Sequence, residues 1–287
     1  MSGRGEPKVW FVTGASSGLG RALSAAAAAR GDQVVATART VESLRELRSS
    51  YPDRIAALTL DVTDDESVDD AVRAARDRHG RIDVVVNNAG YAALGALEEL
   101  TPSQVARQID TNLVGVLRVT RAVLPVMREQ RSGHLVQMSS ISGAQPWVGF
   151  SVYVATKHAV EGFSASLAAE VAHLGIGVTI VEPGPFRTDF FTRSMHVSPP
   201  LPDYATSVGA TRSFLRTFEQ PGDPERAADA VVAAVTSGNP PLRLPLGSYA
   251  VEEFRREYES RLKGLAAWEG VARATDFGAT GGVGGHG

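Results

Sequence analysis

The chain has 287 residues, of which 43% are hydrophobic and 21% charged, as is usual for a globular protein. A net charge of −3 gives no indication of a nucleic-acid partner or of an anionic membrane surface. The absence of cysteine excludes disulfides, thiolate metal sites and cysteine catalysis. The polar N-terminus lacks the apolar run of a signal peptide, and no stretch is apolar enough to span a bilayer, so we expect a cytoplasmic protein with no membrane partner.

The first apolar run, residues 8–13, predicts a buried strand that leads into a glycine-rich turn. A helix over 21–30 follows, and Gly31 ends it. Glycines at such a turn let the backbone approach a diphosphate, and the helix N-terminus offers free N–H groups to the anion. We expect a dinucleotide-binding turn, with an ordinary strand-to-helix turn as the alternative. Its residues are Gly14, Ser16, Ser17, Gly18, Leu19 and Gly20.

The second predicted strand, residues 33–38, ends at Arg39. NAD-binding units usually carry an acid at this place. An acid would repel the 2′-phosphate of NADP, whereas an arginine can pair with it. Arg39, helped by Arg21 beside the glycine turn, therefore favours NADP(H) over NAD(H). The alternative is that Arg39 is a solvated surface charge.

Apolar runs predict further strands over 55–60, 82–86, 133–139, 176–182 and 242–246. Helical patterns cover 41–50, 64–79, 101–129, 151–174, 224–236 and 248–263. Seven strands alternate with helices and no linker interrupts them. We therefore expect a single α/β domain over 1–287, with a doubly wound, mostly parallel seven-stranded sheet of the Rossmann type and helices on both faces. A flexible C-terminal tail is expected over 265–287, which is Gly-rich at its end.

Candidate ligand-binding residues follow two of the middle strands. Asp61 and Val62 end the third strand, where the carboxylate either accepts from an adenine amino group or caps the next helix. Asn87-Asn88-Ala89-Gly90 ends the fourth strand. Its small residues let a ligand lie close, and its amides can tie neighbouring strands together. Asn112 falls inside a predicted helix, where asparagine is a poor helix former, so we expect it to face a water or to distort the helix. The alternative is an ordinary exposed asparagine.

Tyr153 and Lys157 are i and i+4 on a helix that begins near Ser151, so their side chains share one face. A fixed ammonium favours phenolate, and we expect the pKa of Tyr153 to fall toward working pH. Such a phenol can give a proton to a carbonyl oxygen or take one from an alcohol. Taken alone, the two residues fit an ordinary exposed helix pair better.

Residues 189–223 form a Pro-rich stretch with large apolar side chains and no regular pattern. A lid over an apolar pocket and a loop that simply packs on the core are the two interpretations. The six histidines have no ligand spacing with acids, so we expect no metal site. The candidate substrate-pocket residues are Trp147, Phe190, Phe191 and Met195.

Together these motifs resemble the short-chain dehydrogenase/reductase family, over about Lys8 to Leu246. Tyr153 lies thirteen residues after Ser140, the usual interval in that family, which favours Ser140 over Ser139. In chain order the family's motifs match Thr13–Gly20, Asn87–Gly90, Asn112, Ser140, Tyr153, Lys157, and Pro183-Gly184 with Thr188.

The resemblance implies hydride transfer between a nicotinamide and the carbonyl or alcohol group of a small molecule. It implies that Tyr153 is the acid or base, that Lys157 lowers its pKa and holds the nicotinamide ribose, that Ser140 orients the substrate oxygen, and that Asn112 holds a water. The carboxamide would be held by Thr188 and by the backbone at Pro183, Gly184 and Phe186.

The Asn-Asn-Ala-Gly-Tyr and Pro-Gly-Pro-Phe stretches resemble the steroid- and retinol-handling branch of the family. We therefore expect an NADP(H)-dependent reductase of a bulky apolar ketone or aldehyde. An acyl-carrier ketoreductase is disfavoured, because the net charge is negative and no arginine patch stands out. The alternative of another class is an NADP-binding sensor or scaffold without turnover. The resemblance also implies a homodimer or homotetramer, paired through the helices that carry Asn112 and Tyr153.

Overall fold

The computed structural model of the chain describes residues 6–277 and confirms the predicted parallel sheet. Seven strands lie in the order β3-β2-β1-β4-β6-β7-β9, and every neighbouring pair is parallel. The strand order reverses between β1 and β4, which opens a crevice at the carboxyl ends of the strands. The strands are β1 (Val9–Val12), β2 (Gln33–Ala38), β3 (Ile55–Thr59), β4 (Val84–Asn87), β6 (Gly133–Met138), β7 (Ile176–Pro183) and β9 (Arg243–Leu246).

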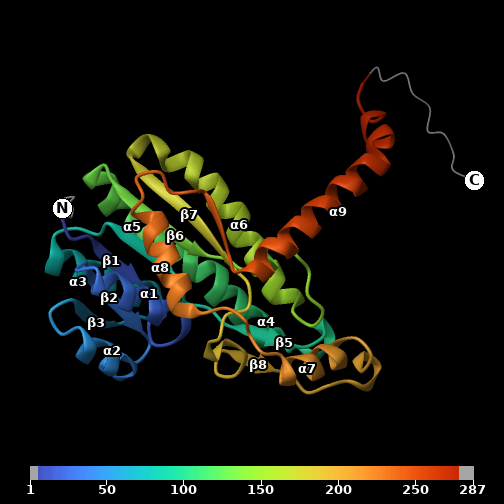
Figure 1. Cartoon of the computed structure of the whole chain (residues 1–287), viewed down its shortest axis with the longest axis horizontal. Coiled ribbons are helices and arrows are strands. Elements are labelled where there is room, and N and C mark those ends of the chain that lie inside the picture. Colours follow the sequence, from blue (N-terminus) through green and yellow to red (C-terminus); the bar gives the residue numbers. More distant parts are fainter. Residues whose placement is uncertain (1–5, 278–287) are drawn as a thin grey trace, which may run out of the picture.

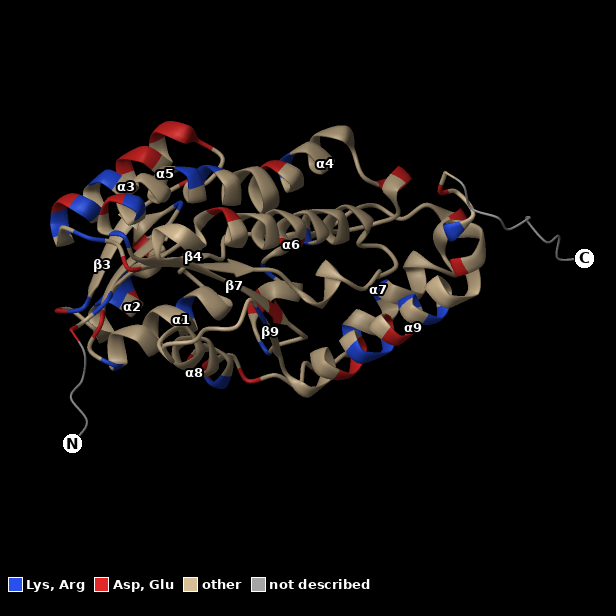
Figure 2. Ribbon diagram, turned by 90° about the horizontal axis from the view of Figure 1, so that it is seen from above, with Lys and Arg blue, Asp and Glu red and all other residues tan. Residues whose placement is uncertain are grey.

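Helices cover both faces of this sheet, as predicted (Figure 2). One face carries α1 (Gly18–Ala29), α2 (Arg45–Ser50) and α8 (Pro224–Val235). The other carries α3 (Asp65–His79), α5 (Gly115–Gln130) and α6 (Ser151–Val171).

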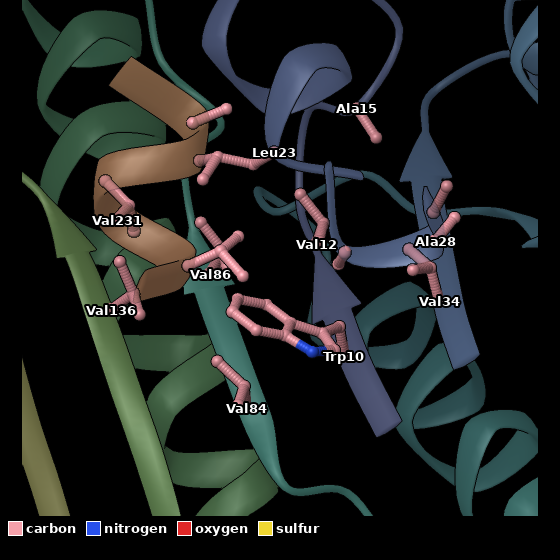
Figure 3. Close-up of a cluster of buried hydrophobic side chains, with 14 of the residues drawn as sticks. Trp10, Val12, Ala15, Leu23, Ala28, Val34, Val84, Val86, Val136 and Val231 are labelled. Carbon is pink, nitrogen blue, oxygen red and sulfur yellow. The ribbon is translucent and has the colours of Figure 1, made fainter. Parts of the chain in front are cut away.

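Strand β1 illustrates how alternate residues fill the two cores. Trp10 and Val12 join the cluster under α1 and α8, whereas Phe11 joins the cluster under α3 and α5. Figure 3 shows the Trp10 ring reaching toward Val84 and Val86 on β4. The indole N–H donates to Asp32 Oδ2 at 2.9 Å, so its burial leaves no polar group unpaired.

The helix predicted over 101–129 is interrupted. Its parts are α4 (Pro102–Ile109), a π-helical turn (Asp110–Val114) and α5. Asn112 lies in the π turn, and its amide bonds to the backbone of Tyr91. Of the two expectations for Asn112, distortion of the helix is confirmed.

Residues 189–223 are more regular than the sequence indicated. They contain β8 (Met195–Val197) and α7 (Val208–Thr217), and β8 pairs in parallel with β5 (Ala92–Leu94) in a separate two-stranded sheet. Arg212 of α7 forms an ion pair with the buried Glu99 at 2.6 Å. A strand of three residues is too short to give a periodic signal in the sequence. The expectation that residues 189–223 have no regular structure was therefore wrong for β8 and α7.

Helix α9 (Ser248–Arg273) is longer than predicted and projects from the body of the molecule (Figure 1). The predicted flexible tail is therefore wrong for residues 265–273, and residues 278–287 lie outside the described part of the chain. Good helix formers such as Leu265 and the i,i+4 ion pair of Glu269 with Arg273 favour continued helix. No helix within residues 6–277 combines the length and apolar character needed to cross a membrane.

Candidate active site

A cavity of about 820 Å³ opens where the strands of the main sheet end. Nearly all predicted site residues line it, although they come from distant parts of the chain. Gly20 and Asn112 are absent from its wall and lie behind it. The lining includes Gly14, Ser16, Ser17, Gly18, Leu19, Arg39, Asp61, Val62, Asn88, Ala89, Gly90, Ser140, Trp147, Tyr153, Lys157, Pro183, Gly184, Phe186, Thr188, Phe190, Phe191 and Met195.

The glycine turn needs its glycines for shape and for close packing. Gly14 has a φ of 66°, a conformation that favours glycine. A Cβ on Gly20 would lie 2.3 Å from Asn88 Nδ2, so that position has no room for a side chain. Asn88 Nδ2 donates to the carbonyls of Thr13 and Gly14, at 2.9 and 3.1 Å. The expectation that the amides tie neighbouring strands together is thus confirmed, and the N-terminus of α1 faces the cavity with its N–H groups free for an anion.

Arg39 and Asp61 lie close to one another on the cavity wall. Burial raises the pKa of Asp61, but hydrogen bonds from Thr63 and the charge of Arg39 outweigh it and hold the pKa below its usual value. Asp64, not Asp61, caps α3, so the cap interpretation of Asp61 is wrong. Arg21 forms an ion pair with Glu46 at 3.0 Å and does not line the cavity. The expected contribution of Arg21 to binding the 2′-phosphate is therefore not seen.

Helix α6 begins at Ser151 and places Tyr153 and Lys157 on one buried face, as predicted. Lys157 Nζ lies 5.7 Å from the centroid of the Tyr153 ring. The same Nζ donates to the carbonyl of Met138 at 2.7 Å, which fixes the ammonium between α6 and the end of β6. The exposed-pair interpretation is wrong, because both residues are buried.

Burial shifts the pKa values of both Tyr153 and Lys157. It raises the pKa of Tyr153 to about 12, against a hydrogen bond from the Ser140 hydroxyl that lowers it. Burial lowers the pKa of Lys157 to about 8, against the charge of Glu161 that raises it. The expected fall in the pKa of Tyr153 is therefore wrong for this structure, because desolvation of the phenolate outweighs nearby stabilisation. The interaction of Tyr153 with Ser140 agrees with the choice of Ser140 over Ser139.

Asn112 is buried behind the cavity and bonds to both backbone groups of one residue. Its Oδ1 accepts the N–H of Tyr91 at 3.1 Å, and its Nδ2 donates to the Tyr91 carbonyl at 2.8 Å. Nδ2 also lies 3.4 Å from Thr156 Oγ1 on α6. Asn112 therefore joins the π turn to α6 and to the segment that follows Gly90.

An aromatic cluster lies beside the Tyr153 phenol. The Phe190 ring is 5.8 Å from that of Tyr153 and 5.4 Å from that of Phe191, and Trp147 lies edge-on to Phe191 at 6.0 Å. Met195 packs on the same cluster. The four candidate pocket residues are thus brought together next to the candidate acid.

The family model described as short chain dehydrogenase matches residues 8–199. The chain belongs to the short-chain dehydrogenase/reductase family. It is similar to a crystal structure of a short-chain dehydrogenase from Streptomyces avermitilis, at 47% identity and a TM-score of 0.89, covering 95% of this chain and 100% of that one. It is also 44% identical to oxidoreductase BOA17 of Botryotinia fuckeliana over 85% of this chain and 90% of that protein.

A variant of actinorhodin polyketide ketoreductase, solved with NADPH, is 30% identical, with a TM-score of 0.71 over 84% of this chain and 96% of that one. This member of the short-chain dehydrogenase/reductase family is therefore an oxidoreductase that uses a nicotinamide cofactor.

Several residues that line the cavity of this short-chain dehydrogenase escaped the sequence analysis. Tyr91 directly follows the Asn-Asn-Ala-Gly motif, and Phe150 directly precedes α6, so both were within reach of motif reasoning. Gln104 and Arg107 of α4 and Arg193 carry no local signal, because their presence depends on how α4 and residues 189–223 fold over the sheet. Residues 6–277 hold no group of three or more His, Asp or Glu side chains placed to bind a metal ion.

Proposed function

We propose that this oxidoreductase transfers a hydride between NADP(H) and a carbonyl or secondary alcohol, with a bulky apolar ketone or aldehyde as its substrate. One observation carries the proposal. The Tyr153 ring is close both to Lys157 Nζ, at 5.7 Å, and to the Phe190 ring, at 5.8 Å. A proton donor at the boundary between a charged wall and an aromatic wall suits a substrate whose reacting oxygen is polar and whose body is not.

In reduction, the Tyr153 hydroxyl gives its proton to the carbonyl oxygen, and in oxidation the phenolate takes it back. A pKa of about 12 keeps the phenol protonated at neutral pH, so it can act as the acid in reduction. The Ser140 hydroxyl, which lowers the pKa of the phenol, would hold the substrate oxygen in line with it. When NADP(H) is bound, it supplies or accepts the hydride.

Lys157 serves the same proton transfer by its charge and position. One N–H group of Lys157 donates to the Met138 carbonyl, and the others remain available to bind the nicotinamide ribose. The ammonium stabilises the phenolate that forms when Tyr153 gives up its proton. Asn112 supports this arrangement from behind through Tyr91 and Thr156.

The residues around the glycine turn fit a dinucleotide. The turn and the N-terminus of α1 would hold the diphosphate, and Asp61 with Val62 would face the adenine. Asn88, Ala89 and Gly90 would border the cofactor, and its carboxamide would lie against Pro183, Gly184, Phe186 and Thr188.

The preference for NADP(H) rests on Arg39, whose guanidinium can pair with a 2′-phosphate. The ketoreductase relative solved with NADPH supports this choice.

The substrate class rests on the aromatic cluster formed by Trp147, Phe190, Phe191 and Met195. Such side chains bind apolar surface and offer few hydrogen bonds, so they select bulk and shape. Three of the four belong to the segment 189–223, which β8 and the Arg212–Glu99 pair hold beside β5. That segment would act as the lid of the substrate pocket.

The test is the loss of NADPH absorbance with a panel of bulky apolar ketones and aldehydes, with NADH in parallel. Turnover with NADPH and little with NADH is expected. If NADPH binds but no member of a broad panel is reduced, and no alcohol of the same panel is oxidised, the NADP-binding sensor replaces the enzyme as the better interpretation.

We also propose a homodimer or homotetramer that pairs through α4, α5 and α6. Light scattering in solution tests this, and a monomer would refute it.

A further inference from the structure

Two buried carboxylates lie behind Lys157, in a cluster to which the reaction above assigns no role. Glu161 follows Lys157 by one turn of α6, and Glu182 lies near the end of β7. They are 8% and 3% exposed. One guanidinium serves both: Arg243 Nε lies 3.2 Å from Glu161 Oε2 and 3.9 Å from Glu182 Oε1.

Arg243 is the one cation of the described residues that lies within 4 Å of these two carboxylates. Two carboxylates buried beside a single arginine cannot both be ionised at low cost. Burial, then the charge of Glu161 and a hydrogen bond to it, raise the pKa of Glu182 to about 8. Glu161 Oε1 is buried and accepts no hydrogen bond within the described part of the chain. A protonated Glu182 would be a hydrogen-bond donor beside Glu161.

The pair is connected to the active site on two sides. The charge of Glu161 raises the pKa of Lys157 against the effect of burial. A Cβ on Gly143 would lie 3.0 Å from Glu161 Oε1 and 2.5 Å from Ser139 Oγ, so Glu161 lies directly beneath the turn that follows Ser140.

Helix α9 adds one titratable group to the surroundings of the pair. Burial and then the charge of Glu182 raise the pKa of Tyr258, while Arg243 and Arg261 lower it. Among the described residues, the titratable and charged groups around the two carboxylates thus include Lys157 from α6, Arg243 from β9 and Tyr258 from α9, with Arg261 beside Tyr258.

We propose that Glu161 and Glu182 share one proton, and that the single negative charge left on the pair holds Lys157 in its ammonium form. Both are positioning residues, since they act on Tyr153 only through Lys157. Their importance for turnover rests on the proposed function, but the charge on Lys157 can be measured without any turnover.

The test is competitive acetylation of the folded protein over a range of pH, read by mass spectrometry. The chain has three lysines, Lys8, Lys157 and Lys263, so two of them act as internal references. Lys157 borders the cavity, which gives a small reagent access to it. The pH at which each amine becomes reactive reports its pKa.

Glu161→Gln should move the titration of Lys157 down by about one pH unit, because the charge that raises the pKa of Lys157 is lost. Glu161→Asp, which keeps the charge, should restore most of the shift. Glu170→Gln, the same change on an exposed part of α6, is the matched control and should leave Lys157 unchanged. A fold loosened by the substitution would expose Lys157 to water and move its titration upward instead.

Glu182→Gln distinguishes a pair that shares one proton from a pair in which both carboxylates are ionised. The amide still donates to Glu161 and removes no charge, so Lys157 should titrate within a few tenths of a unit of the parent protein. A fall as large as that of Glu161→Gln would overturn the proposal, since it would mean that Glu182 is ionised. An unchanged Lys157 in Glu161→Gln would overturn it as well. If that variant does not fold, Glu182→Gln alone decides. All these titrations of Lys157 can be interpreted whether or not the protein reduces a ketone.

Discussion

Asn112 satisfies both backbone groups of Tyr91, accepting its N–H at 3.1 Å and donating to its carbonyl at 2.8 Å. Tyr91 stands between Gly90, on the cavity wall, and β5. One amide on the π turn therefore fixes the backbone at the edge of the cofactor site. The cost of an asparagine within a helix is offset here by the two hydrogen bonds that Asn112 makes to the backbone of another segment.

Replacing Asn112 by Ala should lower the free energy of unfolding by about 2 kcal/mol, because the Tyr91 N–H loses its partner and the Tyr91 carbonyl keeps only the Gln108 amide as a donor. Urea denaturation followed by circular dichroism measures this. Thr111→Ala, in the same π turn, is the control and should cost less than about 0.5 kcal/mol. Equal losses for the two variants would contradict the role assigned to the amide.

Tyr153→Phe should reduce turnover by at least about 100-fold while NADPH binds nearly as before. The substitution removes the proton that reaches the substrate oxygen and leaves the cofactor contacts of Lys157 in place. Absorbance assays measure turnover, and quenching of protein fluorescence measures binding. Tyr249→Phe, at an exposed position on α9, is the matched control. Unchanged turnover in Tyr153→Phe would refute the mechanism.

Arg39→Ala should weaken NADPH binding by about tenfold and leave NADH binding unchanged, because only NADPH offers a 2′-phosphate to the guanidinium. Calorimetric titration with both cofactors gives the ratio. Arg45→Ala, on the exposed side of nearby α2, should alter neither affinity. Equal weakening of both cofactors would show that Arg39 supports the fold of the site instead of selecting the phosphate.

His134 predicts a dependence of stability on pH. Burial, with the charge of Lys8, lowers its pKa from 6.5 to about 4 in the folded protein. Between these values the unfolded chain binds more protons, so stability rises with pH through this window and is lost as pH falls from 6.5 toward 4. The loss should approach about 3 kcal/mol. Urea denaturation of His134→Gln should show a flatter profile, and that of His173→Gln, an exposed control, should match the parent. An equally steep profile in His134→Gln would contradict this assignment.

The sheet could be predicted because its central strands are buried on both faces and appear in the sequence as short apolar runs between turns. Val9–Val12 and Val84–Asn87 are examples, and their parallel pairing follows from the helices that separate them. The glycine turn and the Tyr153–Lys157 pair could also be predicted, since both depend on fixed local spacing.

What could not be predicted depends on long-range contacts. The π turn requires the backbone of Tyr91 to lie against Asn112, twenty-one residues away. The high pKa of Tyr153 depends on how deeply the finished fold buries it. The Glu161–Glu182 pair forms only when α6 packs on β7, and no local pattern in the sequence predicts it.

The three-residue pairing of β5 with β8 has a mechanical consequence. Ala92 N donates to the Ser194 carbonyl and Ser198 N to the Leu94 carbonyl, both at 3.0 Å, so residues 189–223 are stitched to the strand that begins just after Tyr91. If these residues act as a lid, they cannot move as an independent flap. Their displacement would either break the pairing with β5 or strain the hydrogen bonds between Tyr91 and Asn112, at the edge of the cavity.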